Sequence, residues 1–227
     1  MHIQILIISL FAAREYIAPT DTDSRSPCPF LNTLANYGIL SRDGKDIPLD
    51  MIKYAVMQEA NVNDFIPQQV LNFVSQIAHK NEDGELSIHL SDLGNHEVVE
   101  HDSSLTREDY DGGRGDNINI STQLVDQLLG FAKDGYLKLE DIIAARKLRV
   151  EQSRKLASHV ELTTREWSTA HANSVLLAGV MGKDYKISVE HAKIFLLQER
   201  FPDGWAKRSR TLGTREFLFR VAQCATS

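Results

Sequence analysis

The chain has 227 residues, 42% hydrophobic and 25% charged, and its 31 acidic against 25 basic residues give a formal net charge of −6. This length suits one domain, or at most two small ones, and lets a chain bury roughly 70% of its unfolded surface. The composition argues against general disorder. A net negative surface repels polyphosphate, and no stretch is both basic and aromatic, which argues against a nucleic-acid partner.

An apolar run opens the chain. From Ile3 to Ala13 the residues are almost all hydrophobic and end in small ones, which is typical of the core of a secretory signal and too short to span a bilayer. We therefore predict a signal peptide or N-terminal extension over residues 1–17, secretion, and no membrane association. A buried N-terminal strand or helix is the alternative. Residues 18–227 are predicted to form the one folded domain.

Helical periodicity dominates the rest of the chain, and no clear run of alternating residues indicates long strands. An all-α fold is therefore predicted. In chain order, apolar spacing and capping residues predict helices over residues 29–38, 50–60, 67–77, 121–135, 139–157, 164–181, 188–200 and 214–222. Short strands are possible only at 3–9 and 86–90, and the stretch 109–119 is rich in Asp, Gly and Asn and predicts a loop.

The sequence Pro27-Cys28-Pro29 places a cysteine at the start of a helix, because a proline inside a helix is tolerated only in the first turn. Free N–H groups and the positive helix end converge there, and both stabilise a thiolate. Such a thiolate could be a nucleophile, a redox centre or a metal ligand. No hydrolase signature and no second nearby cysteine support the first two roles. The third fits haem iron, and a buried structural cysteine fits this stretch equally well.

A second polar stretch runs from Glu100 to Arg107 and holds two carboxylates, an imidazole and two hydroxyls within five residues. Glu100 and Ser104 offer hard oxygens suited to Mg²⁺. His101 can move protons near neutral pH. The alternative for this stretch alone is a solvated polar loop, where such residues usually lie.

Together, the two stretches resemble the fungal haem-thiolate peroxidases, the group of chloroperoxidase and the short peroxygenases. Pro-Cys-Pro at a helix start is followed by Glu-His-Asp-x-Ser-Leu-Thr-Arg, then by Gly115-Asp116-Asn117 and by Gln-Glu-Arg-Phe-Pro-Asp-Gly-Trp at 198–205. The resemblance covers about residues 24–208. It implies a single-domain, chloroperoxidase-like helical fold around a haem. It also implies an enzyme that uses H₂O₂ to oxygenate small apolar or aromatic molecules.

The resemblance implies a role for each matched residue. Cys28 would be the proximal ligand to the iron of haem b. Glu100, the backbone carbonyl of His101 and Ser104 would hold Mg²⁺ near a haem propionate, whose charge the cation would offset. His101 would be half of the distal acid–base pair, and Asp102 would orient its surroundings.

The other half of that pair is normally a glutamate, and its position here holds Asn173. An amide can form hydrogen bonds but cannot carry a proton at ordinary pH. Loss of a general base typically costs ~10²–10⁴-fold in rate. Neither Glu166, two turns earlier, nor His171 is an obvious substitute, so we expect His101 to act as the base while Asn173 holds the peroxide.

Three alternatives stay open at this stage. The first is a haem-thiolate enzyme repurposed for a specialised step of secondary metabolism, and the second is a haem-binding protein without catalysis. The third is an all-α interaction domain with a structural Cys28. Cys224, three residues from the end, is left over if Cys28 binds iron, and it predicts a free thiol or a homodimer joined through that residue.

Overall fold

The computed structural model describes residues 14–96 and 98–226 of the chain. The apolar run from Ile3 to Ala13 lies outside the described residues, so the signal peptide and secretion stay predictions. Among the described helices, none is long and apolar enough to cross a membrane.

Helices make up most of the described structure, as the periodicity predicts. The eight α-helices found in the described ranges are α1 (Pro29–Asn36), α2 (Leu49–Ala60), α3 (Phe65–Val74), α4 (Thr122–Leu129), α5 (Leu139–Ser153), α6 (Thr164–Met181), α7 (Val189–Gln198) and α8 (Thr214–Ala225). Two short 3₁₀ helices, η1 (Leu90–Gly94) and η2 (Asp111–Gly113), lie in the connection between α3 and α4. The prediction of a helical fold is confirmed.

Two small antiparallel sheets join the helices. The first has the order β1–β3–β2, with β1 (Ile47–Pro48), β3 (Leu86–Ile88) and β2 (His79–Lys80). The second pairs β4 (Tyr136–Lys138) with β5 (Lys186–Ser188), and its central pair, Leu137 and Ile187, is buried. Among the described strands, only β3 lies at a predicted position, because strands of two or three residues are too short to show an alternating pattern, and the possible strand at 3–9 lies outside the described residues.

Several helix ends differ from the predicted ones for local reasons. Helix α3 begins two residues before Pro67, which a helix tolerates because the N–H groups of its first turn have no intrahelical partner. Helix α4 ends at Leu129, and Gly135, with φ of 76°, forms the turn before β4 instead. Helix α6 begins at Thr164, as predicted from its capping residues, and the Glu166 carboxylate accepts from the Thr163 N–H at 2.8 Å in a capping box.

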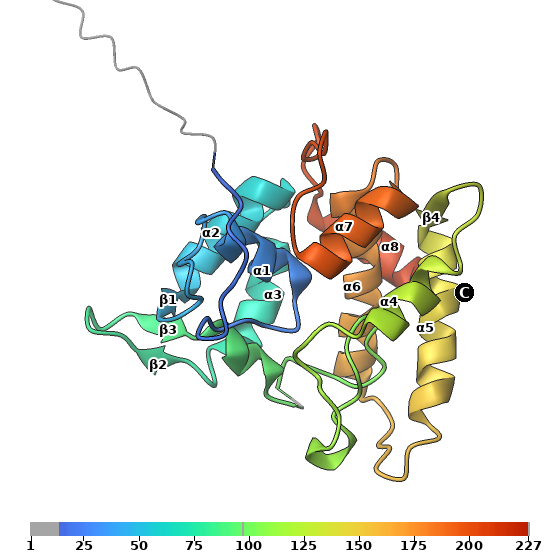
Figure 1. The fold of residues 1–227 in the computed structure, drawn as a ribbon, viewed down its shortest axis with the longest axis horizontal. Coiled ribbons are helices and arrows are strands. Elements are labelled where there is room, and N and C mark those ends of the chain that lie inside the picture. Colours follow the sequence, from blue (N-terminus) through green and yellow to red (C-terminus); the bar gives the residue numbers. More distant parts are fainter. Residues whose placement is uncertain (1–13, 97, 227) are drawn as a thin grey trace, which may run out of the picture.

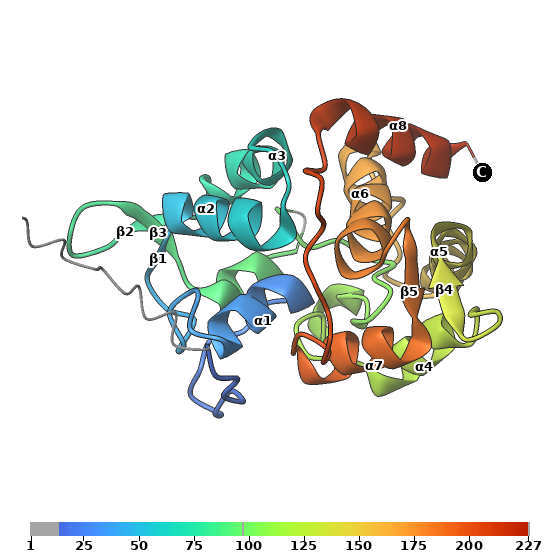
Figure 2. The same cartoon turned by 90° about the horizontal axis from the view of Figure 1, so that it is seen from above.

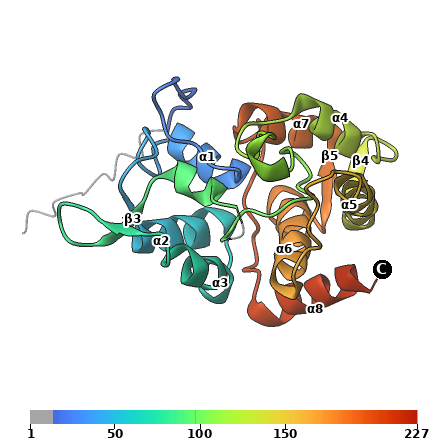
Figure 3. The ribbon, with the colours of Figure 1, turned by 90° about the horizontal axis from the view of Figure 1, so that it is seen from below.

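The helices form two groups side by side (Figures 1 and 2). Helices α1 to α3 and the three-stranded sheet form one group, and α4 to α8 with the β4–β5 pair form the other. One apolar cluster lies within the first group, and the larger one lies mainly in the second group but includes Ala60 of α2 and Ile66 of α3. Phe30 and Phe201 pack against both clusters. The segment between α7 and α8 runs between the groups (Figure 2), and the green segment after η1 crosses from one to the other (Figure 3). The predicted site residues lie on these connections and on α1 and α6.

Candidate functional site

Cys28 is the N-cap residue of α1, and Pro29 occupies the first helical turn, as predicted. Burial raises the pKa of the Cys28 thiol, and the backbone N–H groups of Leu31 and Phe30 at the helix start lower it by a smaller amount. The N–H groups at the helix start therefore act in the direction expected from the sequence, and burial opposes them. A bound cation would favour the thiolate, so a sulfur at this helix start fits a metal ligand.

The loop before Cys28 is closed by Asn32. The Asn32 Oδ1 atom accepts from the Ser26 N–H at 2.8 Å and from the Ser26 hydroxyl at 2.9 Å, and its Nδ2 donates to the Ser26 carbonyl at 2.8 Å. Both side chains are buried. These bonds fix the backbone on either side of the cysteine, so the direction of the sulfur is set by the fold.

A buried ion pair between Arg107 and Glu199 is hydrogen-bonded to this loop through Asn32. The Glu199 Oε1 atom accepts from Asn32 Nδ2 at 2.8 Å and from Arg107 Nη2 at 2.7 Å. Arg107 also donates from Nε to the carbonyl of Ile118 at 2.8 Å. Glu199 follows the last residue of α7 and lies in the segment that carries the family resemblance, but sequence reasoning gave it no role. The network connects the cysteine loop to the loop that carries His101.

His101 is buried, with 6% of its surface exposed, and it contacts two groups that define its tautomer. Its Nδ1 lies 2.7 Å from the Asp102 carbonyl, which can only accept, so Nδ1 carries the proton. Its Nε2 therefore bears a lone pair and lies 3.4 Å from Asn173 Nδ2. Burial, helped by the positive charge of Arg146, lowers the pKa of His101 to about 4. The imidazole is neutral at neutral pH and can accept a proton.

The backbone around His101 is pinned by buried charged groups. The Asp109 Oδ1 atom accepts from the Ser103 N–H at 2.6 Å and from Arg149 Nη2 at 3.0 Å. Arg146 donates to the Ser103 carbonyl at 3.1 Å, and Arg149 donates to the Ser104 carbonyl at 2.8 Å. Because both arginines belong to α5, this helix sets the position of the loop relative to Asn173 on α6.

A buried carboxylate with a free oxygen lies beside His101. The Glu100 Oε2 atom lies 2.7 Å from His96 Nδ1 and 3.0 Å from Asn117 Nδ2. Its Oε1 is buried and has no hydrogen-bond partner among the described residues. Ligand atoms of His96, Glu100 and Asp102 lie within 4.8 Å of one another. An unpartnered buried carboxylate oxygen in such a group fits a bound divalent cation.

The observed group overlaps the predicted Mg²⁺ ligands only at Glu100. The Ser104 hydroxyl accepts long hydrogen bonds from the N–H groups of Thr106, at 3.4 Å, and Arg107, at 3.3 Å. The His101 imidazole faces Asn173, which leaves its carbonyl for the predicted role. His96 was missed, although it lies four residues before Glu100, a spacing that could have drawn attention to it.

Helix α6 brings Asn173 into hydrogen-bond range of His101. Two other titratable residues of this helix, Glu166 and His171, make their hydrogen bonds elsewhere. Glu166 is held in the capping box at the start of the helix. His171 Nδ1 donates to the Trp167 carbonyl at 2.9 Å, and the residue lines a small cavity of about 40 Å³ together with Cys224. The prediction that neither residue replaces the glutamate agrees with this geometry.

The predicted homodimer through Cys224 finds no support in the structure. Cys224 is a free cysteine on α8 with only 2% of its surface exposed. A sulfur buried to this extent cannot meet a second chain unless α8 moves. The free thiol, the other outcome predicted for Cys224, agrees with this burial.

Comparison with known proteins agrees with this description. The family model described as "Peroxidase, family 2" matches residues 14–210. The chain is 29% identical over 210 residues to an aromatic peroxygenase of Coprinellus radians, covering 80% of this chain and 77% of that protein. It is 33% identical over 101 residues to a chloroperoxidase of Leptoxyphium fumago (43% and 27%). It is 28% identical over 207 residues to an aromatic peroxygenase of Cyclocybe aegerita (80% and 54%).

The fold and these matches define an oxidoreductase of the peroxidase class. The chain belongs to peroxidase family 2, which confirms the resemblance seen in the sequence. The family implies a haem-thiolate cofactor. The chain spans 77% of the length of the Coprinellus radians peroxygenase. It spans 27% of the chloroperoxidase and 54% of the Cyclocybe aegerita peroxygenase.

Proposed function

We propose that this chain is a haem-thiolate peroxygenase or peroxidase that uses H₂O₂ to oxygenate small apolar or aromatic organic molecules. Family membership and relatives named aromatic peroxygenase and chloroperoxidase support this function. The observation that carries it within the molecule is the neutral His101, whose Nε2 lone pair faces the amide of Asn173. We propose haem b as the cofactor, with Cys28 as its ligand.

The cysteine loop would hold and tune the cofactor. Haem iron bound through a thiolate supplies two-electron oxidation, because the sulfur donates electron density that favours O–O cleavage. The Phe30 and Leu31 N–H groups would withdraw part of the sulfur's charge by hydrogen bonding. Asn32 and Glu199 would keep the loop from relaxing when the cofactor binds.

His101 and Asn173 would divide the work that a histidine and a glutamate usually share. His101 Nε2 would take the proton from one peroxide oxygen and return it to the other. Of the two side chains, the imidazole accepts a proton at ordinary pH and the Asn173 amide does not. The Asn173 amide would hold the peroxide by hydrogen bonding. A base with a pKa of about 4 accepts a proton less readily than an ordinary histidine, so slow peroxide cleavage is expected.

We also propose a Mg²⁺ ion at Glu100, where the unpartnered Oε1 supports a cation. The His101 carbonyl and the Ser104 hydroxyl are further proposed ligands from the family resemblance. His96 and Asp102, whose side chains group with Glu100, would then bind the ion or hold its ligands in place. The ion would offset the buried carboxylate charge beside the active site.

A second candidate is a haem-thiolate enzyme that performs a specialised biosynthetic step without peroxide. The amide at Asn173 favours it, because a site that needs no proton shuttle has no need of a carboxylate there. The test is to give haem-loaded protein ¹⁸O-labelled H₂O₂ and a small aromatic substrate. Label in the product supports the peroxygenase. Unlabelled product or none, with haem bound through Cys28, rejects it in favour of the second candidate.

A further inference from the structure

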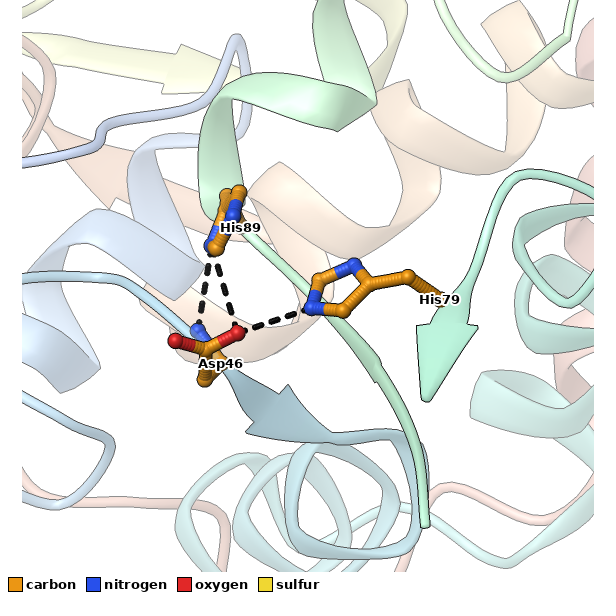
Figure 4. Close-up of side chains that lie close together, drawn as sticks. All are labelled: Asp46, His79 and His89. Atoms are coloured by element: carbon orange, nitrogen blue, oxygen red, sulfur yellow. Dashed lines mark hydrogen bonds and ion pairs between the residues drawn. The ribbon is translucent and has the colours of Figure 1, made fainter. Parts of the chain in front are cut away.

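Three side chains of metal-ligating types, Asp46, His79 and His89, converge on the three-stranded sheet of the first helical group (Figure 4). Asp46 precedes β1, His79 begins β2, and His89 follows β3. Since Ile47 pairs with Ile88, Asp46 lies opposite His89 across the ladder. His79 pairs with Ser87, two residues before His89. Residues two apart on a strand share a face, so the sheet register places all three side chains on one face.

The distances between these groups are close to those of a metal site. His79 Nε2 lies 2.8 Å and His89 Nδ1 lies 3.9 Å from Asp46 Oδ1. The ligand atoms of all three lie within 4.8 Å of one another, and the two imidazole centroids are 4.8 Å apart. Ligands at ~2.0–2.1 Å from a tetrahedral ion lie roughly 3.3 Å from each other. The two pairs that include Asp46 are therefore about half an ångström from that separation, which small side-chain rotations can cover, and the two imidazoles lie within 4.8 Å of each other.

The backbone that carries these groups is already held in place. Asp46 has a φ of 50°, a left-handed conformation that Asp tolerates, and its N–H donates to His89 Nδ1 at 3.1 Å, a hydrogen bond that an ion bound at Nδ1 would replace. The His89 N–H donates to Asp92 Oδ2 at 2.8 Å, and the next residue, Leu90, donates to the Gly44 carbonyl at 2.8 Å. Binding an ion would thus order few new groups, which keeps its entropic cost low.

We propose that Asp46, His79 and His89 form a binding site for a divalent transition-metal ion of the Zn²⁺ type. Two imidazole nitrogens and one carboxylate oxygen suit Zn²⁺, Cu²⁺ or Ni²⁺ and suit Mg²⁺ and Ca²⁺ poorly. The side chains are 60%, 38% and 40% exposed, in the same order, so an ion enters freely and water completes its coordination. The ion ties the loop before α2 to both strands of the β2–β3 hairpin.

The binding site is tested on the haem-loaded full chain. Bound divalent ions are first removed with a chelator, and the protein is then titrated with ZnCl₂ by calorimetry in a buffer with millimolar Mg²⁺. Wild-type protein is expected to show a Zn²⁺ site that His79→Ala and His89→Ala each weaken at least tenfold. His191→Ala is the control, because only the backbone of His191 takes part in a helix cap, with Ser188, and the residue lies on α7. Equal Zn²⁺ affinity in all four proteins, or no uptake by the wild type, would overturn the proposal.

Two measurements on the wild type hold even if a variant misfolds. At a Zn²⁺ concentration one hundredfold above Kd, Tm is expected to rise by roughly 5–10 °C. Zn²⁺ is also expected to protect His79 and His89, but not His191, from carbethoxylation mapped by mass spectrometry. Unprotected imidazoles at saturating Zn²⁺ would show that the cluster is only an ion pair with Asp46.

Discussion

Replacing Asn173 by glutamate restores a proton-carrying group beside His101. This substitution is the sharpest test of the proposal that His101 acts as the base while Asn173 only holds the peroxide. Asn173 Nδ2 lies 3.4 Å from His101 Nε2, and the asparagine side chain is exposed, so there is room for one more methylene. Two charges ~4 Å apart interact by about 1 kcal/mol in water and about 4 kcal/mol at an effective dielectric constant of 20. That range corresponds to roughly 1–3 pKa units.

The carboxylate should therefore raise the pKa of His101 from about 4 to about 5–7. We expect Asn173→Glu to increase kcat/KM for H₂O₂ by at least ~10-fold, and by up to ~10²–10⁴-fold if the glutamate becomes the full general base. The acid limb of the pH–rate profile should move upward by the same number of pKa units. Stopped-flow measurement of peroxide-dependent oxidation from pH 3 to about pH 8 covers both effects.

Asn173→Gln is the matched control, because it has the length of glutamate without the charge. If the gain comes from the carboxylate, the glutamine variant stays close to the wild-type rate and keeps its pH profile. A glutamate variant that is no faster than wild type would refute the argument that Asn173 limits proton transfer. Equal gains in both variants would refute the electrostatic part and leave side-chain length as the cause.

Three further predictions follow from the buried groups. The pKa of His101 is about 4 in the folded chain, below its ordinary 6.5, so the unfolded chain binds more protons between these two pH values. The free energy of unfolding should therefore fall by up to about 3 kcal/mol as the pH drops from about 6.5 to 4, which urea unfolding measures. Glu199→Gln leaves the Arg107 charge buried without its partner and should cost ~3–5 kcal/mol in the same assay, whereas exposed Glu82→Gln should change stability by no more than about 0.5 kcal/mol. Cys28→Ala should abolish both product formation and the absorption of thiolate-ligated haem, with retention of either one contradicting its assignment as the ligand.

The sequence predicted what depends on local pattern. The spacing of apolar residues located the helices, and Pro29 fixed Cys28 at a helix N-terminus, since these are rules about neighbouring residues. The start of α6 at Thr164 was predicted correctly for the same reason, because Thr163 and Glu166 have the spacing of a capping box. Helix ends were less predictable where a turn competes, as at Gly135, whose conformation depends on the pairing of β4 with a strand fifty residues later.

The parts that were missed depend on contacts between distant residues. Burial raises the pKa of the Cys28 thiol more than the helix end lowers it, and burial at one position is decided by the whole fold. Asp46 and His89 lie opposite each other only because a two-residue strand pairs in one register. A one-residue shift in that register would turn one of these side chains to the other face.

Glu199 shows most directly why the two sequence motifs belong to one site. It lies 92 residues after Arg107 and 167 after Asn32, yet one of its oxygens accepts from both. Removing its charge would leave an arginine of the His101 loop buried and unpaired, and would loosen the clamp that orients Cys28. The cysteine motif and the acidic-loop motif are therefore coupled by a residue in neither, so a substitution at Glu199 should disturb both halves of the site together.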